Sequence, residues 1–299
     1  MRPSPHTLLI NCAIGFCIDN DTWIHPLHAF GYSPELIEHK VELRRRGGTV
    51  KPDVVVNSNR LNHALIFDCK GGISSDEGQI SRYRSIEMSD IGRYIRIHNP
   101  PEFSHDICIL DYAENHAILE AAIANLPFLT LGEGQLTRSR RFTKFELNQA
   151  FQDSVPIPEG MVEPVSYYPF SEIDSQGVIV KHVLRAMMTI LQDRRRREMD
   201  VLAADTYRNP DVMKTIHPMY RIMGREHQES LERRVSEILT HIQKAYSDFT
   251  LKVAEIQTKK REGGDATVAI SNLTVDVDEI VKREESETGL DFWTRGSSP

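Results

Sequence analysis

Cysteine is scarce in this 299-residue chain, and the few cysteines present form no motif that is typical of a metal site. The four thiols belong to Cys12, Cys17, Cys69 and Cys108, with no C-x-x-C pair and no zinc-like spacing of cysteine and histidine. This pattern excludes the familiar cysteine-based zinc modules. The simplest interpretation is that the four cysteines are reduced and form no disulfide bonds, as is usual in the cytosol, so we expect a cytoplasmic protein.

A hydrophobic run long enough to cross a membrane is also lacking. Residues 7–18 are apolar, but a transmembrane helix needs about 20 residues of this kind. No A-x-A cleavage site follows before the acidic stretch at 19–21. We therefore expect a buried strand or the start of a helix there rather than a signal peptide, and no membrane partner.

The sequence lacks the excess of positive charge that many nucleic-acid-binding proteins carry. Its formal net charge is −7, but residues 262–299 hold nine acidic and three basic residues, which leaves 34 acidic and 33 basic residues over 1–261. A nearly neutral body with local basic clusters is compatible with binding a phosphate backbone without arguing for it. A P-loop or another glycine-rich phosphate cradle is missing too, which counts against a nucleotide hydrolase. Without a recognisable base-reading module, no sequence specificity is predicted.

Two β-rich segments stand out against this background. Residues 53–57 form a β-branched run, DVVVN, and residues 63–70 form a second hydrophobic run, HALIFDCK. The Asn- and Ser-rich residues between them are typical of a tight turn, so the sequence predicts a hairpin.

The register of this hairpin brings charged residues together. If the turn is centred between Arg60 and Leu61, the numbers of paired residues sum to 121, and Asp53 lies opposite Asp68. Lys70 shares a face with Asp68 because side chains alternate along a strand. Two carboxylates and an ammonium on one face are costly in a core. A divalent cation between the carboxylates would account for them.

These residues resemble the signature of the PD-(D/E)xK nuclease superfamily. Pro52-Asp53 precedes Asp68-Cys69-Lys70 by a strand, a turn and a second strand, and Gly71-Gly72 follows. Gln79 and Tyr83 then lie four residues apart, on one face of a helix expected over 76–88. This Q-x-x-x-Y pattern is similar to that of the RecB-like branch. The resemblance covers about residues 30–115.

The resemblance implies a Mg²⁺ site, with Mn²⁺ as a possible substitute, and a role for each matching residue. It assigns the cation to Glu38, Asp53, Asp68 and the backbone carbonyl of Cys69. It assigns catalysis to Asp53, Asp68, Lys70, Gln79 and Tyr83. Arg82 and Arg84 are the expected phosphate contacts.

The residues before the hairpin predict a helix over about 33–46. Ser33 resembles an N-cap, Pro34 fits the first turn, and two glycines follow the last basic residues. On this helix Glu38 has the direction that best suits a third metal ligand, and Glu42 is next. The alternative is that both are solvated surface carboxylates.

The order of expected elements indicates an α/β fold with a restriction-endonuclease-like mixed-sheet core. We expect further strands at 92–99, 106–112 and 128–131, and helices at 115–125 and 143–153. The domains are predicted as a nuclease-like catalytic domain at 1–155, a helical extension at 156–262 and an acidic flexible tail at 263–299.

The helical extension begins after a proline-rich segment at 155–170, which we interpret as a linker. A helix is expected over 176–202, where the arginine block 194–197 fits a solvated helix face better than a phosphate-binding patch. Near-heptad spacing then predicts a long helix over 225–261. Its apolar seam needs a partner, which is another helix of this chain, a second copy or another protein.

The sequence thus predicts a metal-dependent nuclease that hydrolyses phosphodiester bonds, with DNA the favoured substrate. Stand-alone nucleases of this kind often resemble restriction or antiviral defence effectors. Two alternatives stay open: a nuclease fold that serves as a scaffold or binding subunit without catalysis, and a metal-dependent enzyme on another phosphate substrate.

Overall fold

The computed structural model describes residues 2–71, 77–123, 126–159, 161, 164–196, 205–245, 254–260 and 266–271. The chain divides into two compact units, and each is described by itself. The first comprises Pro5–Tyr168 and Ile222–His227, and the second comprises Met1–Ser4, Pro169–Arg221 and Gln228–Pro299.

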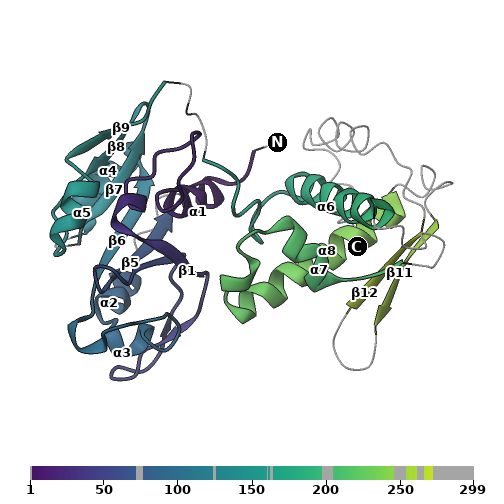
Figure 1. The fold of residues 1–299 in the computed structure, drawn as a ribbon, viewed down its shortest axis with the longest axis horizontal. Helices are drawn as coiled ribbons and strands as arrows, with labels where there is room; N and C mark the ends of the chain where they lie inside the picture. The colour runs from purple at the N-terminus through teal and green to yellow at the C-terminus, as the bar shows by residue number, and fades with distance from the viewer. Residues whose placement is uncertain are drawn as a thin grey trace, which may run out of the picture. The chain divides into compact units, whose positions relative to one another are not determined.

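The first unit is built on a seven-stranded mixed sheet (Figure 1). Its strands, in spatial order, are β1 (Ser33–Ile37), β4 (Val54–Ser58), β5 (His63–Lys70), β6 (Ser104–Tyr112), β7 (Phe128–Gly132), β8 (Gln135–Arg138) and β9 (Ser154–Pro156). The central strands β5, β6 and β7 are parallel, and the outer pairs are antiparallel. The expected α/β class with a mixed sheet is confirmed.

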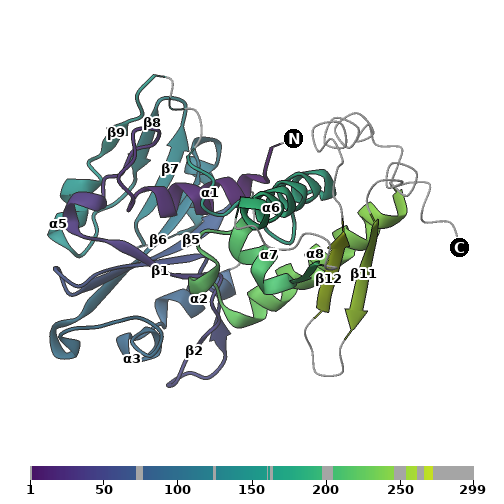
Figure 2. The same cartoon turned by 45° about the vertical axis from the view of Figure 1, so that its right-hand side comes forward.

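Helices cover both faces of this sheet. Ile66 and Phe67 point to opposite faces because they are adjacent in β5. Phe67 lies 6.2 Å from the ring of Phe16, which follows helix α1 (Pro5–Gly15). Ile66 instead packs in a cluster with residues of the α2 (Glu77–Arg84) and α3 (Met88–Ile91) region. Figure 2 shows α1 on one side of the central strands and α3 on the other.

The predicted hairpin register is confirmed. Val54 pairs with Phe67, and Ser58 pairs with His63, so the numbers of each pair sum to 121. Strand β5 has the predicted bounds, and β4 begins one residue later than expected, directly after Asp53.

The helix predicted over 33–46 is wrong. Strand β1 occupies Ser33–Ile37 and pairs with β4, and a short hairpin follows from β2 (Val41–Glu42) and β3 (Thr49–Val50). The buried residues Val41 and Leu43 have the period of a strand, and their packing decides the structure over the helix-start signal of Ser33 and Pro34.

The strand predicted over 92–99 is also wrong. The segment forms turns and bends after α3, before the 3₁₀ helix η2 (Pro100–Glu102). Ile95 is buried in the same cluster as Ile66, and Ile97 packs against it. The apolar residues that suggested a strand therefore anchor a loop on the sheet. Helices α4 (His116–Ala122) and α5 (Phe145–Ala150) lie within the ranges predicted for them.

The described residues of the second unit form three α-helices and a small sheet. They are α6 (Gln176–Arg196), α7 (Asn209–Ile216), α8 (Arg225–Ala245, which begins in the first unit), β10 (Asp205–Arg208), β11 (Ala254–Lys260) and β12 (Ala266–Ser271). The spatial order of the strands is β10-β12-β11. Among the described residues, no helix is both long and apolar enough to cross a membrane.

The long helix predicted over 225–261 is confirmed over Arg225–Ala245, which form α8, and is wrong over 254–260; residues 246–253 lie outside the described residues. Residues 254–260 form strand β11, which pairs antiparallel with β12. The seam residues Leu231, Val235 and Ile238 are fully buried within the chain, so its own side chains cover them. The structure gives no support for a partner or second copy at these positions. The expected tail contains β12, and residues 272–299 lie outside the described residues, as does Arg197 of the arginine block.

The predicted linker ends in core residues. Tyr168 and Phe170 have no exposed surface. Asn11 of α1 accepts from the backbone N–H of Tyr168 at 2.7 Å and donates to its carbonyl at 2.7 Å. The end of this proline-rich segment is therefore fixed on α1.

A buried polar network holds the start of β5 and β6. The hydroxyl of Tyr32 lies 3.0 Å from Nδ1 of His63, whose Nε2 lies 3.3 Å from Oδ2 of Asp106. The same carboxylate accepts from the backbone N–H groups of Thr143 and Lys144, both at 3.1 Å. Burial alone would raise the pKa of Asp106, but the hydrogen bonds from His63 and Thr143 outweigh it and lower the pKa below its usual value.

Asp106→Asn is expected to lower the free energy of unfolding by about 2 kcal/mol at neutral pH, because it removes hydrogen bonds to a charged group. A carboxylate whose pKa is lowered by folding stabilises the folded state at pH values above the ordinary aspartate pKa. This stabilisation is lost as the pH falls from the ordinary pKa to the lowered one. The difference between wild type and variant should therefore shrink in acid. Urea unfolding at neutral and acidic pH measures it, with the exposed Asp153→Asn as control. A difference that stays constant with pH would contradict this assignment.

Candidate metal centre

The candidate site lies where β4 begins and β5 ends. Asp53 precedes β4, and its backbone N–H donates to the carbonyl of Phe67 at 3.1 Å. Its carboxylate Oδ2 accepts from the N–H of Cys69 at 2.5 Å. The hairpin thus extends to Asp53 and Asp68, and it brings the two carboxylates to neighbouring strand ends as the sequence predicted. Both are buried, at 7% and 2% exposure.

Asp68 has one cationic neighbour and one amide neighbour. Nζ of Lys70 lies 2.8 Å from Oδ2 of Asp68, and Nε2 of Gln79 donates to Oδ1 at 3.4 Å. Oδ2 is buried, and within the described part of the chain it has no hydrogen bond of good geometry. Burial raises the pKa of Asp68, and the charge of Lys70 opposes this effect.

Tyr83 joins helix α2 to the segment between β3 and β4 that carries Asp53. It is buried, and its hydroxyl donates to the carbonyl of Lys51 at 2.9 Å. Gln79 and Tyr83 therefore both face the site from one side of α2, as their spacing predicted. Arg82 and Arg84 are exposed on the same helix, and their phosphate contacts remain a prediction.

Glu38 reaches the site from a loop rather than from a helix. It follows β1 with a positive φ of 51°, and its N–H donates to the carbonyl of Asp53 at 2.9 Å. Its carboxylate is buried and forms an ion pair of 2.5 Å with Lys51. Burial, and then the charge of Asp53, raise the pKa of Glu38. The alternative ligand Glu42 is largely exposed and pairs with Arg93 instead.

His6 is the site residue that the sequence analysis missed. Its Nε2 lies 3.3 Å from Oδ1 of Asp53, and single ligand atoms of His6, Glu38 and Asp53 all lie within 4.8 Å of one another. Burial alone would lower the pKa of His6, but the hydrogen bond and charge of Asp53 raise it. The only sequence signal was its place in the first turn of α1, before an apolar run.

The close packing of Gly71 fixes the position of His6. A Cβ atom on Gly71 would lie 2.5 Å from the backbone nitrogen of His6 and 2.9 Å from its Cα. Only glycine lets the end of β5 approach α1 this closely. The strand end that carries Asp68 and Lys70 thus also supports the histidine.

The predicted ligands are divided between two adjacent groups. One group is His6, Glu38 and Asp53, and the other is Asp68 with Lys70 and Gln79. Cys69 takes part through its N–H, which supports Asp53. In total, three buried carboxylates lie at the ends of three neighbouring strands, β1, β4 and β5, an arrangement that is unfavourable without cations nearby.

A family model, the MJECL32 domain, matches residues 5–168, which is more than half of the chain. The chain belongs to the MJECL32 domain family. No curated protein and no solved structure matches it. All residues of the two groups lie inside the MJECL32 domain, whose matched range coincides with the continuous part of the first unit.

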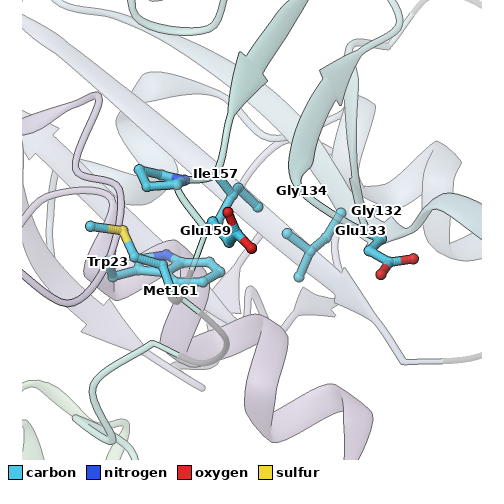
Figure 3. Close-up of a pocket in the computed structure, with 9 residues that line it drawn as sticks. Trp23, Gly132, Glu133, Gly134, Ile157, Glu159 and Met161 are labelled. Atoms are coloured by element: carbon cyan, nitrogen blue, oxygen red, sulfur yellow. The ribbon is translucent and has the colours of Figure 1, made fainter.

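The MJECL32 domain also contains a pocket of about 440 Å³ that is separate from these groups (Figure 3). The turn between β7 and β8 and the segment after β9 line it together with Trp23. Among the described residues that line it, Glu133 and Glu159 are acidic, and none is a candidate metal ligand. The candidate metal ligands therefore lie at the strand ends and not in this pocket.

Proposed function

We propose that this protein is a metal-dependent nuclease that hydrolyses phosphodiester bonds in nucleic acid, with DNA favoured. The observation that carries this proposal is the cluster of His6, Glu38 and Asp53, whose two carboxylates are buried. Asp68, also buried, lies beside Lys70 at the adjacent end of β5. The PD-(D/E)xK resemblance supplies the reaction, and the confirmed hairpin register supports it.

The donor set fits a small divalent cation. Carboxylate oxygens are the ligands that Mg²⁺ and Mn²⁺ prefer, and an imidazole nitrogen from His6 shifts the preference toward Mn²⁺. Oδ2 of Asp68 lies 2.8 Å from the Lys70 ammonium, so a cation bound there would share this oxygen with Lys70. Burial raises the pKa values of Glu38 and Asp68, and a bound cation would favour their charged forms.

A bound cation would polarise a phosphate oxygen and lower the pKa of a water molecule. The protein's own residues would then supply position and proton transfer. Lys70 lies where it can orient or deprotonate the attacking water, or stabilise the charge that develops on the phosphate. Gln79 donates a hydrogen bond to Asp68, and Tyr83 holds the backbone of Lys51, two residues before Asp53. Arg82 and Arg84 would contact flanking phosphates.

The test is a cleavage assay on plasmid, linear duplex, single-stranded DNA and RNA, with Mg²⁺, Mn²⁺ or EDTA. Wild type should cut at least one DNA substrate only when a metal is present, and Asp68→Ala and Lys70→Ala should not. Absence of both cutting and metal binding would refute the proposal and favour the scaffold alternative. Metal binding without cutting on any of these substrates would point to the other phosphate-based alternative.

His6→Gln is expected to weaken Mn²⁺ binding more than Mg²⁺ binding, because only the softer ion gains from an imidazole nitrogen. Loss of one ligand of this kind should reduce Mn²⁺ affinity by at least roughly tenfold. Isothermal titration with each metal measures the two ratios, and His25→Gln in an exposed loop is the control. Equal losses for both metals would show that His6 acts through packing alone.

A further inference from the structure

A short segment from the C-terminal half of the chain is part of the first unit. Residues Ile222–His227 lie outside the range that the family model matches, yet they cluster with Pro5–Tyr168. Met223 forms a parallel bridge with Ile37, and the N–H of Gly224 donates to the carbonyl of Ile37 at 2.9 Å. The segment therefore adds to β1 directly before Glu38.

Gly224 touches the backbone at Glu38. A Cβ atom on Gly224 would lie 2.7 Å from the carbonyl oxygen of Glu38 and 2.8 Å from Cα of His39. Both are backbone atoms, so neither can move aside as a flexible side chain would. The two chain segments fit against each other only because residue 224 has no side chain.

The segment is also anchored beyond Gly224. Nε2 of His227 lies 2.6 Å from the hydroxyl of Tyr168, whose backbone is held by Asn11 of α1. His227 is buried, and its proximity opposes the rise in the pKa of the Glu38 carboxylate. An exposed ion pair of 3.1 Å joins Glu226 to Lys40. The segment 222–227 thus contacts the chain both before Glu38, at Ile37, and after it, at Lys40.

We propose that Ile222–His227 is a positioning clamp that holds Glu38 in its left-handed conformation, so that the metal centre is complete only when this C-terminal segment is in place. The inference rests on the proposed function, because Glu38 matters through the cation. Gly224 and His227 are positioning residues and touch no reacting atom.

The conformation of Glu38 explains why a clamp is needed. A φ of 51° is strained for a residue other than glycine, and such conformations persist only where the surroundings fix them. The N–H of Glu38 is bonded to Asp53, and the preceding carbonyl is bonded to Gly224. Residues 225–227 are also the first turn of α8. A partner that displaces the start of α8 would therefore release Glu38 and weaken the metal centre.

The test compares Gly224→Ala and Tyr168→Phe with Gly92→Ala in the full-length chain. Gly92 is a matched control, because a Cβ there would also meet close neighbours, the Ile97 side chain at 2.8 Å and the carbonyl oxygen of Met88 at 3.0 Å. Neither neighbour is a candidate metal ligand. The readouts are hydrogen exchange at the amides of Glu38 and Gly224, thermal unfolding without metal, and Mn²⁺ affinity.

Gly224→Ala should speed exchange at the Glu38 amide and weaken Mn²⁺ binding roughly 10- to 100-fold, the usual effect of losing support for a ligand. Tyr168→Phe, which leaves the chain's shape nearly unchanged, should shift both readouts in the same direction, and Gly92→Ala should shift neither. If Gly224→Ala does not fold, Tyr168→Phe decides. Unchanged exchange and affinity in the folded variants would overturn the clamp. If wild type binds no Mn²⁺, the metal proposal fails, and the exchange data still decide whether the clamp exists.

Discussion

Lys70→Ala is expected to lower phosphodiester cleavage by roughly 10²- to 10⁴-fold, the usual contribution of a positioned proton-transfer group. The Lys70 ammonium lies 2.8 Å from Asp68, and the Lys70 side chain is only 12% exposed. A water molecule that fills the space in the variant would be neutral and could not replace the positive charge. The carboxylates that would hold the cation remain in the variant. We therefore expect metal binding to survive while the cleavage rate falls.

Lys70→Arg separates the two roles that lysine could have. Arginine keeps the positive charge but cannot give up its proton in a protein. If Lys70 stabilises charge on the phosphate, the arginine variant should keep much of the activity. If Lys70 deprotonates water, it should be as inactive as Lys70→Ala. Single-turnover cleavage measures both variants, with Lys144→Ala at the other end of β5 as control. Full activity in Lys70→Ala would remove this residue from the mechanism.

Glu38→Gln is expected to raise thermal stability by a few degrees without metal and to abolish stabilisation by metal. Burial and the charge of Asp53 raise the pKa of Glu38. A carboxyl whose pKa is raised by folding destabilises the folded state at neutral pH, and stability recovers as the pH falls toward that raised pKa. Glutamine removes the charge and keeps the shape of the side chain. The gain over wild type should therefore be larger at neutral pH than in mild acid.

Added metal should reverse the order of the two proteins. A ligand at 100 times its dissociation constant stabilises a folded protein by about 2.7 kcal/mol, and only wild type should gain this amount. Thermal unfolding with Mn²⁺ or EDTA, at neutral and mildly acidic pH, measures both effects. Glu42→Gln is the matched control because that side chain is 70% exposed. If Glu38→Gln were stabilised by Mn²⁺ as much as wild type, Glu38 would not be a ligand.

The sequence predicted the parts of the site that depend on local pattern. The two hydrophobic runs predict the strands, the position of the turn between them sets the register, and the register brings Asp53 and Asp68 to neighbouring positions. The i, i+4 spacing of Gln79 and Tyr83 likewise required only that a helix form. These features need no knowledge of distant contacts.

The remaining parts depend on contacts between distant segments. His6 reaches Asp53 because α1 packs against the end of β5 at Gly71, and no local pattern encodes that approach. Glu38 was placed on a helix because Ser33 and Pro34 resemble a helix start, whereas strand pairing and Gly224 fix its true conformation. The extent of α8 was overestimated for a related reason, because the seam of Leu231 and its neighbours did not mark the end of the helix.

Diffraction from crystals grown with Mn²⁺ would test the central claim most directly, through the anomalous signal of the ion. We predict a peak within bonding distance of the Asp53 carboxylate, shared with Asp68 on one side and with His6 or Glu38 on the other. The peak should be absent in Asp53→Asn crystals under the same conditions. No peak at these strand ends in wild type, or a peak that Asp53→Asn leaves unchanged, would contradict the proposed metal centre.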